Sequence, residues 1–375
     1  MVRIQIFQFR TTSVGLNAYS GIQTLVVAVL FALLVIQRDT SLKTIFTNRL
    51  FCNLSFLYSL GMVSIIWSAL PAFSFYMAFQ NLVFLSAIFY LASLKDSFAD
   101  LESFLIKSSL LFMLIALLGD IYRYGFSIIF GWHHLEIGGV GAMLLCYSVG
   151  EIVYCSSVLR FDPQRKKLLW RTAIGGFIIL IWSTSSGANV SSIIGLLSLA
   201  FVGKNKTFKI VAFLIIMVFT LIPDSITSVL PFIFPGKSSI GITSVGYRMH
   251  LWESLWELTR QKPILGWGYA AIERINQYYA IDSHNSIIGI IGGLGFVGGF
   301  LLVSYIIIAF VKIYKNRYIA GYTGLFGGFM CLLADSNTIG FLSSKTSLLT
   351  IAFFTIVVIS YFYQFYPYNN SYDQD

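Results

Sequence analysis

One histidine stands at the start of a long apolar segment. His284 follows Asp282 and Ser283, and Asn285 separates it from the apolar run 286–311. Imidazole titrates near neutral pH, so a histidine at the mouth of a membrane-spanning helix is a candidate general base. The alternative interpretation is an interfacial histidine that caps this helix beside Asp282 and Ser283.

Several cations of one loop precede this histidine, among them Arg248, Arg260, Lys262 and Arg274. Guanidinium groups bind phosphate oxygens bidentately and stay charged at any working pH. A diphosphate leaving group requires such cations, because negative charge builds on it as the bond breaks. A base beside several cations therefore suits chemistry on an anionic, lipid-linked substrate, with Arg248 and Arg274 as the stronger candidates. Binding of lipid headgroups is the alternative, and it is favoured for Arg260 and Lys262.

Other polar and aromatic side chains could complete such a site. Asp335, in Ala334-Asp335-Ser336-Asn337, could orient the imidazole or bind a sugar hydroxyl, and a solvated loop carboxylate is the alternative. Arg123, just outside another apolar segment, could be a further phosphate ligand. Aromatic residues of the loop could stack on sugar faces or anchor the chain at the membrane interface, namely Trp252, Trp267, Tyr269, Tyr278 and Tyr279.

Several other chemistries lack their usual residues. The expected outer face has no Asp-x-Asp motif, no pair of metal-binding carboxylates and no His/Cys cluster, so we predict no metal and no cofactor. A P-loop motif is also absent, which argues against ATP-driven transport. Glu151 is the main charge within an apolar segment, and one carboxylate is thin support for an ion-coupled pump. The run Asp100-Leu101-Glu102 is interpreted as a solvated face.

The composition indicates the class of protein. Of 375 residues, 57% are hydrophobic and only 11% are charged, whereas a soluble domain carries about a quarter charged residues. Apolar stretches near the roughly 20 residues that a bilayer requires recur along the chain. We therefore predict an all-α polytopic membrane protein with about 11–12 transmembrane helices. The net charge of +9 lies in short loops, as in positive-inside topology, which argues against nucleic-acid binding.

The expected spans form a single integral membrane domain over residues 1–375. They lie near 16–36, 50–70, 72–93, 104–119, 138–159, 168–184, 188–203, 208–222, 284–311, 318–334 and 346–364. The loop between the fifth and sixth spans should be cytoplasmic because it is basic, with Arg160, Arg165, Lys166, Lys167 and Arg171. Alternation then places the long loop 223–283 outside. Within it, leucines and tryptophans at three- and four-residue spacing predict an amphipathic helix near 247–259.

Three short motifs follow one another in and after this loop. They are Gly246-Tyr247-Arg248 with Trp252, then Pro263-Ile264-Leu265-Gly266-Trp267-Gly268, then His284-Asn285, with Gly295 completing a His-x10-Gly pattern. In this order, in a long loop between two spans, they resemble the main external loop of the O-antigen ligase and polysaccharide polymerase superfamily. The resemblance covers roughly residues 180–340.

This resemblance implies a membrane-embedded, metal-independent glycosyltransferase of the multi-span C-type architecture. Its substrates would be glycans carried on undecaprenyl diphosphate. Carried over by position, His284 would be the base, Arg248 and Arg274 the diphosphate ligands, and Asp335 a supporting residue. Attack opposite the leaving lipid diphosphate would invert the anomeric configuration.

The chain departs from the family in one short turn. Many members have Ser-Arg in the external turn that is occupied here by Ser185-Ser186-Gly187-Ala188-Asn189. Either another cation such as Arg123 supplies the missing charge, or this chain handles the diphosphate differently.

Four functions stay open at the level of sequence. We favour a polymerase of lipid-linked repeat units for O-antigen, capsule or exopolysaccharide, by analogy with the family. A ligase that transfers the glycan to lipid A core or another acceptor is next, followed by a lipid-linked oligosaccharide flippase and by a non-catalytic scaffold. The expected location is a bacterial inner or plasma membrane with the site on the external face. Expected partners are the lipid-linked donor, the glycan acceptor and membrane lipids, with a chain-length regulator and a flippase as further candidates.

Overall fold

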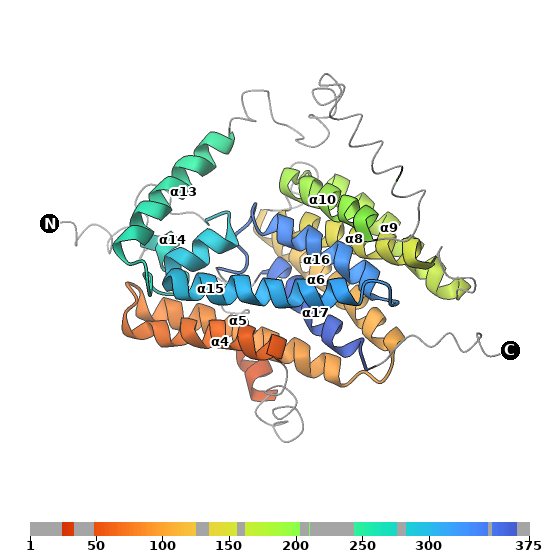
Figure 1. Cartoon of the computed structure of the whole chain (residues 1–375), viewed down its shortest axis with the longest axis horizontal. Helices are drawn as coiled ribbons and strands as arrows, with labels where there is room; N and C mark the ends of the chain where they lie inside the picture. Colours follow the sequence, from red (N-terminus) through yellow and green to blue (C-terminus); the bar gives the residue numbers. More distant parts are fainter. Residues whose placement is uncertain are drawn as a thin grey trace. The chain divides into compact units, whose positions relative to one another are not determined.

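The computed structural model confirms the all-α class. It describes residues 25–33, 49–124, 135–155, 162–202, 210, 244–275, 283–343 and 347–365. Every regular element in these residues is helical (Figure 1). Residues 25–33 are helical. The further helices are α4 (Arg49–Val63), η1 (Ser64–Ile66), α5 (Pro71–Ser93), α6 (Phe98–Tyr124), α8 (Leu135–Cys155), α9 (Pro163–Trp182), α10 (Ser186–Val202), α13 (Ser244–Gln261), α14 (Ile272–Ile275), α15 (Ser286–Lys315), α16 (Tyr322–Asp335) and α17 (Leu348–Phe362).

Several helices have the length and composition of membrane spans. Within the described residues, three are long and apolar enough to cross a membrane, namely Pro71–Ser93, Leu135–Tyr154 and Ser286–Lys315. Three further apolar helices are shorter, namely Phe51–Ile66, Ser186–Ala200 and Leu348–Phe362. The chain is therefore a multi-pass membrane protein. Of the expected span 208–222, all but Ile210 lies outside the described residues.

The chain divides into two compact units. Unit 1 comprises Met1–Leu91, Gly246–Tyr305 and Ile339–Thr346. Unit 2 comprises Ala92–Val245, Ile306–Thr338 and Ser347–Asp375. His284, Arg248 and Arg274 thus belong to unit 1, whereas the other two polar candidates, Asp335 and Arg123, belong to unit 2.

In unit 1, α13 covers the residues for which an amphipathic helix is expected. Its buried face carries Leu251 and Leu255, which lie one turn apart and pack with Ile272 of α14. The opposite face carries charged side chains such as Glu253 and Glu257, which are exposed. This pattern fixes which face of α13 lies on the rest of unit 1.

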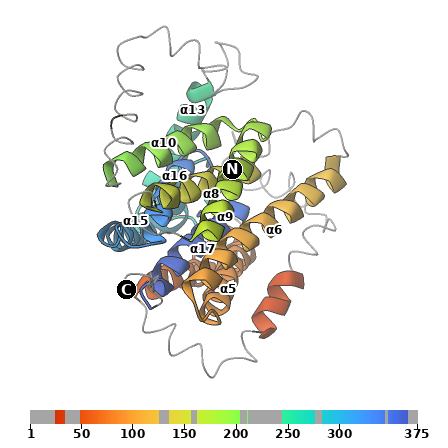
Figure 2. The ribbon, with the colours of Figure 1, turned by 90° about the vertical axis from the view of Figure 1, so that its right-hand side faces the viewer.

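In unit 2, small residues let α8 pack closely against its neighbours α9, α10 and α16 (Figure 2). A Cβ atom added at Gly150 of α8 would lie 2.8 Å from the Cα atom of Gly324 in α16. One added at Gly176 of α9 would lie 2.7 Å from the carbonyl oxygen of Gly141. Glycine at such positions is typical of helix contacts within membranes, where backbones approach without side chains between them.

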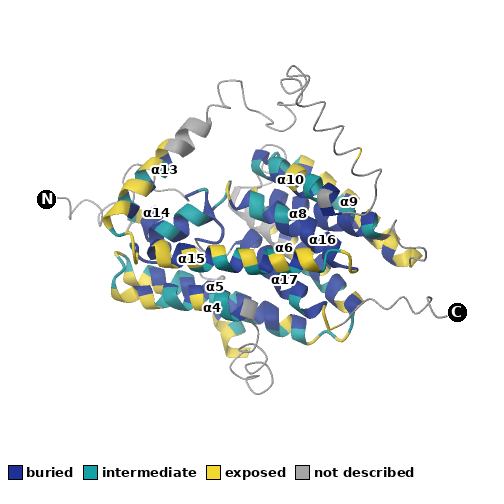
Figure 3. Cartoon of the chain, viewed as in Figure 1, coloured by how far each residue is buried: buried dark blue, intermediate teal, exposed yellow. Residues whose placement is uncertain are grey.

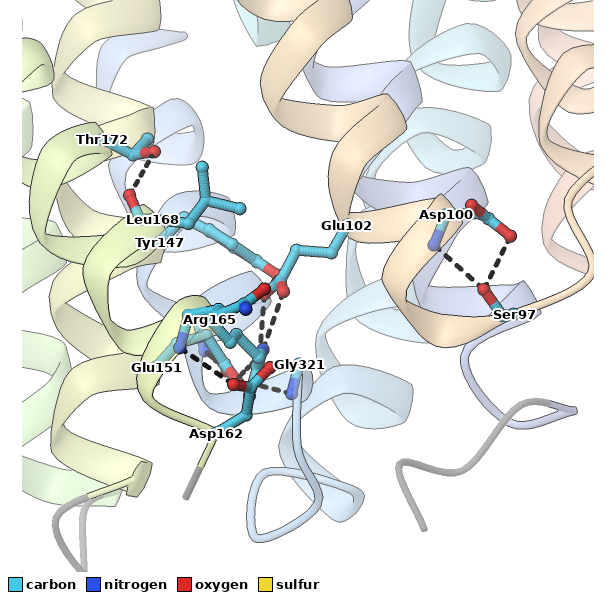
Figure 4. A network of polar contacts seen from close by, with 12 residues as sticks. Ser97, Asp100, Glu102, Tyr147, Glu151, Asp162, Arg165, Leu168, Thr172 and Gly321 are labelled. Atoms are coloured by element: carbon cyan, nitrogen blue, oxygen red, sulfur yellow. Dashed lines mark hydrogen bonds and ion pairs between the residues drawn. The ribbon is translucent and has the colours of Figure 1, made fainter. Parts of the chain in front are cut away.

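An ion cluster links three helices inside unit 2 (Figure 4). Arg165 of α9 places Nε 2.7 Å from Oε2 of Glu102 in α6 and Nη2 2.7 Å from Oε2 of Glu151 in α8. All three side chains are buried. The Tyr147 hydroxyl donates to the other oxygen of Glu102 at 2.8 Å. The interpretation of Glu102 as part of a solvated face is therefore wrong, because its carboxylate is paired in the interior.

Glu151 also holds the start of α16. Its two carboxylate oxygens accept the backbone N–H groups of Gly321 and Gly324, each at 2.7 Å. Gly321 precedes the first residue of α16 and has no side chain that could cap the helix. Glu151, the main charge within an apolar segment, is thus a helix cap and an ion-pair partner. Burial on its own would lower the pKa of Arg165, but hydrogen bonding to Glu102 and the charge of Glu151 raise it above its ordinary value.

Candidate functional site

A break in α15 organises the neighbourhood of the histidine. At Gly295 the backbone takes φ 66° and ψ −168°, so the helix is interrupted. The turn of residues 263–268 lies against this break and donates two N–H groups to the carbonyls of Gly292 and Gly293, at 3.1 and 2.7 Å. The N–H group of Phe296 donates back to the proline carbonyl of the same turn at 2.8 Å. Backbone groups around the break are therefore paired, which avoids the cost of leaving buried N–H and C=O groups without partners.

Glycine is needed on both sides of this contact. A Cβ atom at Gly295 would collide with the carbonyl of Ile264 and lie 2.6 Å from the backbone nitrogen of Leu265. A Cβ atom at Gly266, where φ is 65°, would lie 2.6 Å from the nitrogen of Gly295. The glycine-rich turn and the His-x10-Gly pattern, which are separate motifs in the sequence, are thus the two halves of one contact.

Two tryptophans tie the same turn to other parts of unit 1. Trp267 donates its indole N–H to the carbonyl of Leu258 in α13 at 2.8 Å. Trp67, which follows η1, donates its indole N–H to the carbonyl of Leu265 at 2.8 Å. The turn is therefore joined by hydrogen bonds to α13, to Trp67 and to the first half of α15.

The segment around His284 has an unusual backbone. His284 has φ 52°, in the left-handed region, which costs a non-glycine residue about 1–2 kcal/mol. Asn285 caps α15, because its side-chain oxygen accepts the N–H groups of Ile287 and Ile288, each at 3.0 Å. The cap of this helix is therefore Asn285, and the half-buried imidazole of His284 stands just before it.

Ser283 fixes the other side of the histidine. Its backbone N–H donates to Oε1 of Glu273 at 3.1 Å, and its carbonyl accepts the indole N–H of Trp252 at 3.0 Å. Its hydroxyl donates to the carbonyl of Asn285 at 2.9 Å. A strained residue held by neighbours on both sides is typical of functional sites, where the surroundings offset the strain.

The cations of unit 1 are described to different extents. Arg274 is exposed, and its guanidinium carbon lies 5.3 Å from the ring centre of Phe73. Arg248 lies in the first turns of α13, and its side chain is outside the described part of the chain. Lys262 has its ammonium 4.2 Å from the ring centre of Trp267. Arg274 of the one-turn helix α14 is thus exposed, although the residue before it, Glu273, is buried.

The aromatic candidates are held by hydrogen bonds of their own. Tyr269 is fully buried, and its hydroxyl accepts from Asn81 at 2.7 Å and donates to the carbonyl of Leu342 at 3.1 Å. Burial raises the pKa of Tyr269 well above its ordinary value. Its ring has no exposed face on which a sugar could stack. The prediction that Tyr269 contacts a sugar is therefore wrong. Trp252 and Trp267 are half-buried. The predicted residues Tyr278 and Tyr279 lie outside the described residues.

Asp335 is the last residue of α16 and is fully buried. Its Oδ1 accepts the hydroxyl of Thr338 at 2.6 Å and lies 3.4 Å from the hydroxyl oxygen of Ser191. A Cβ atom at Gly187, in the turn where many family members carry Ser-Arg, would lie 3.4 Å from the same oxygen. A solvated loop carboxylate is therefore excluded. Arg123 lies in the last turn of α6, and its side chain is outside the described residues.

The roles of Glu273 and Ser283 could not be predicted from the sequence. Glu273 is one of five acidic residues that stand among five basic ones in the loop 223–283, and Ser283 is recognisable only as a neighbour of His284. The signal lies only in the folded chain, where both are buried and joined to each other.

Fold and site together define a multi-pass α-helical membrane protein with a histidine fixed ahead of a broken helix. Residues 172–303 match the family model described as O-Antigen ligase. The match confirms the resemblance to the O-antigen ligase and polymerase superfamily over this part of the chain. It includes His284, Arg248, Arg274 and both halves of the glycine contact, whereas Asp335 lies beyond its end. No curated protein matches the chain.

Proposed function

We propose that this chain is a membrane-embedded glycosyltransferase that polymerises repeat units carried on undecaprenyl diphosphate. The observation that carries the proposal is His284, held in a left-handed conformation before α15 within the stretch that matches O-antigen ligase. In this proposal the site faces the outer side of a bacterial inner or plasma membrane, and the reaction needs neither metal nor cofactor. A chain-length regulator and a flippase are the proposed partners.

His284 acts as the general base. It takes the proton from an acceptor sugar hydroxyl while the hydroxyl oxygen attacks the anomeric carbon of the donor. The bond between that carbon and the lipid diphosphate breaks, and the diphosphate leaves as an anion on the opposite side, which inverts the configuration. General-base catalysis of this kind contributes about 10²–10⁴-fold in rate.

Arg248 and Arg274 bind the diphosphate. Charge grows on the leaving group as the bond breaks, so cations near it stabilise the transition state more than the ground state. The exposure of Arg274 leaves its guanidinium accessible to a substrate from outside the protein. The half-buried Trp252 and Trp267 contact the sugar rings of the substrate in this proposal. The assignments of Asp335 and Arg123 to the same reaction stay predictions.

A ligase is the second candidate, because the matching family model is described as O-Antigen ligase. It would use the same base and cations, and it would differ in its acceptor, such as lipid A core. A flippase is less well supported, because the two proposed diphosphate ligands, Arg248 and Arg274, lie in one loop before His284 and not within the spans.

The test is the size distribution of surface polysaccharide in a bacterial strain that lacks the gene. The strain is complemented with wild type, His284→Ala, Arg248→Ala or Arg274→Ala, at equal membrane levels. Polymerase activity predicts long chains with wild type and single lipid-linked repeat units with the variants. Ligase activity predicts that long chains accumulate on undecaprenyl diphosphate when the variants are expressed.

Two control substitutions replace the same types of side chain, a histidine and an arginine, at exposed positions. His250→Ala removes an exposed histidine of α13, and Arg260→Ala removes an exposed arginine of the same helix. Both are expected to behave as wild type. If His284→Ala also behaves as wild type, His284 is not the base and the catalytic proposal fails.

A further inference from the structure

One buried carboxylate of unit 1 has no role in the mechanism above. Glu273 lies in α14 and is only 7% exposed, although the next residue, Arg274, is exposed. Burying a carboxylate is costly unless hydrogen bonds replace its hydration. Its position therefore implies specific contacts that the chain retains at some cost.

Two of these contacts converge on one oxygen of Glu273. Oε1 accepts the backbone N–H of Ser283 at 3.1 Å, and it lies 3.4 Å from the hydroxyl oxygen of Ser343. Ser343 also donates to the carbonyl of Gly340 at 2.9 Å, which places it in the compact turn after residue 339. One carboxylate oxygen thus joins α14, the residue before His284 and the 339–343 segment.

The first turn of α15 packs against this junction. A Cβ atom at Gly289 would collide with the Ser343 side chain and lie 2.8 Å from the hydroxyl oxygen of Ser283. Residues 283–289 therefore have little room to move relative to Glu273. The left-handed φ of His284 requires such a support, because strained backbone relaxes where the surroundings do not hold it.

We infer that Glu273 is a positioning residue for His284. It holds Ser283 so that the imidazole meets the acceptor hydroxyl in reactive geometry, and it acts as a hydrogen-bond acceptor without taking a proton from the substrate. This inference rests on the proposed function, since it assigns Glu273 to the base of that reaction.

The test uses full-length protein in detergent with the lipid-linked repeat unit extracted from the deletion strain. Glu273→Ala removes the acceptor for the Ser283 N–H, whereas Glu273→Gln keeps an oxygen at the same place. We expect Glu273→Ala to lower kcat by about 10–100-fold, because small misplacements of a catalytic group are that costly. KM for the donor should stay within about 2-fold, since the diphosphate ligands are untouched. Glu273→Gln should recover most of kcat with an unchanged pH profile.

Glu253→Ala is the matched control, because Glu253 is an exposed carboxylate of α13. Wild-type kcat in Glu273→Ala would overturn the inference. Loss of activity in Glu273→Gln as deep as in Glu273→Ala would also overturn it, because the charge would then be the requirement. If Glu273→Ala fails to fold, Glu273→Asp decides, since it keeps the charge but withdraws the oxygen by one methylene. A reduced kcat in Glu273→Asp would support the inference that Glu273 positions His284, and a wild-type kcat would overturn that inference.

The same measurements separate this inference from the function on which it rests. Full activity in His284→Ala would contradict the proposed catalytic role of His284 itself. Loss of activity in His284→Ala together with full activity in Glu273→Ala would leave the proposed function standing and remove the role of Glu273.

Discussion

At the scale of single residues, the geometry around His284 combines strain with support. Its left-handed backbone is bounded by Asn285, which caps α15, and by Ser283, which Glu273 and Trp252 hold. Each contact contributes about 1 kcal/mol or more, so together they can offset the cost of the strained residue. The backbone on both sides of His284 is thus held by hydrogen bonds.

The cap gives the first prediction. Asn285→Ala removes the acceptor of two N–H groups and should destabilise the folded protein by about 1 kcal/mol. It should also lower activity, because the residue before α15 loses its fixed conformation. Asn285→Ser retains a neutral side-chain acceptor at this buried position and should keep most of the stability. Thermal unfolding in detergent measures the difference. Equal melting of Asn285→Ala and wild type would show that the cap does not hold this segment.

The candidate base could be found from sequence, but its support could not. His284 is recognisable because a titratable side chain stands directly before a long apolar run. Glu273 lies 10 residues from Ser283 and 70 from Ser343, so no local spacing links the three. Long-range hydrogen bonds to the backbone leave no pattern in side-chain types, and this is the physical reason they were missed.

At the scale of elements, the turn of residues 263–268 and α15 form one unit of structure. Their contact depends on backbone groups, and glycine is required where the two chains meet. Periodicity predicts α13 well, because leucines at helical spacing mark its buried face. Periodicity cannot predict the break at Gly295. The run 286–311 is apolar on both sides of the break, so its sequence predicts one continuous span.

The break gives the second prediction. Gly295→Ala places a side chain at positive φ and against the Ile264 carbonyl, so it should destabilise the protein by about 2 kcal/mol or more. Gly175→Ala in α9 is the matched control, since nothing lies within 4 Å of an added Cβ atom there. That control should be neutral or stabilising by up to about 1 kcal/mol. Thermal unfolding of both variants in detergent is the measurement. Similar melting temperatures would contradict the close contact.

At the scale of the whole molecule, composition gives the fold class but not the environment of each helix. A bilayer leaves the helix as the one solution for long apolar segments of this kind, so the all-α class follows directly. Yet α17 is almost wholly buried, whereas α15 exposes Phe300 at 71% and Ile307 at 55% (Figure 3). Both helices are strongly apolar, because lipid and protein interior select the same side chains. Which helices face lipid therefore cannot be read from hydropathy.

The ion cluster of unit 2 joins residues that lie far apart in the sequence. Glu102, Glu151 and Arg165 come from three different helices, and Glu151 also caps a fourth, α16. From the sequence alone, Glu102 is expected on a solvated face, Glu151 is an isolated charge in an apolar segment, and Arg165 belongs to a basic loop. Nothing in their spacing brings them together, and only the packing of α6, α8 and α9 does so.

This cluster gives the last prediction. Arg165→Ala leaves two buried carboxylates without their cation, which should destabilise the protein by about 3–5 kcal/mol. Arg165→Lys should recover part of this loss, because one ammonium cannot reproduce the planar guanidinium that reaches both carboxylates. Arg171→Ala removes an exposed arginine of the same helix and should change stability by less than about 0.5 kcal/mol. The yield of folded protein and its melting temperature in detergent distinguish the three variants. If Arg165→Ala and Arg171→Ala have the same melting temperature, the buried carboxylates do not need Arg165 for stability. The cluster then does not hold these helices together.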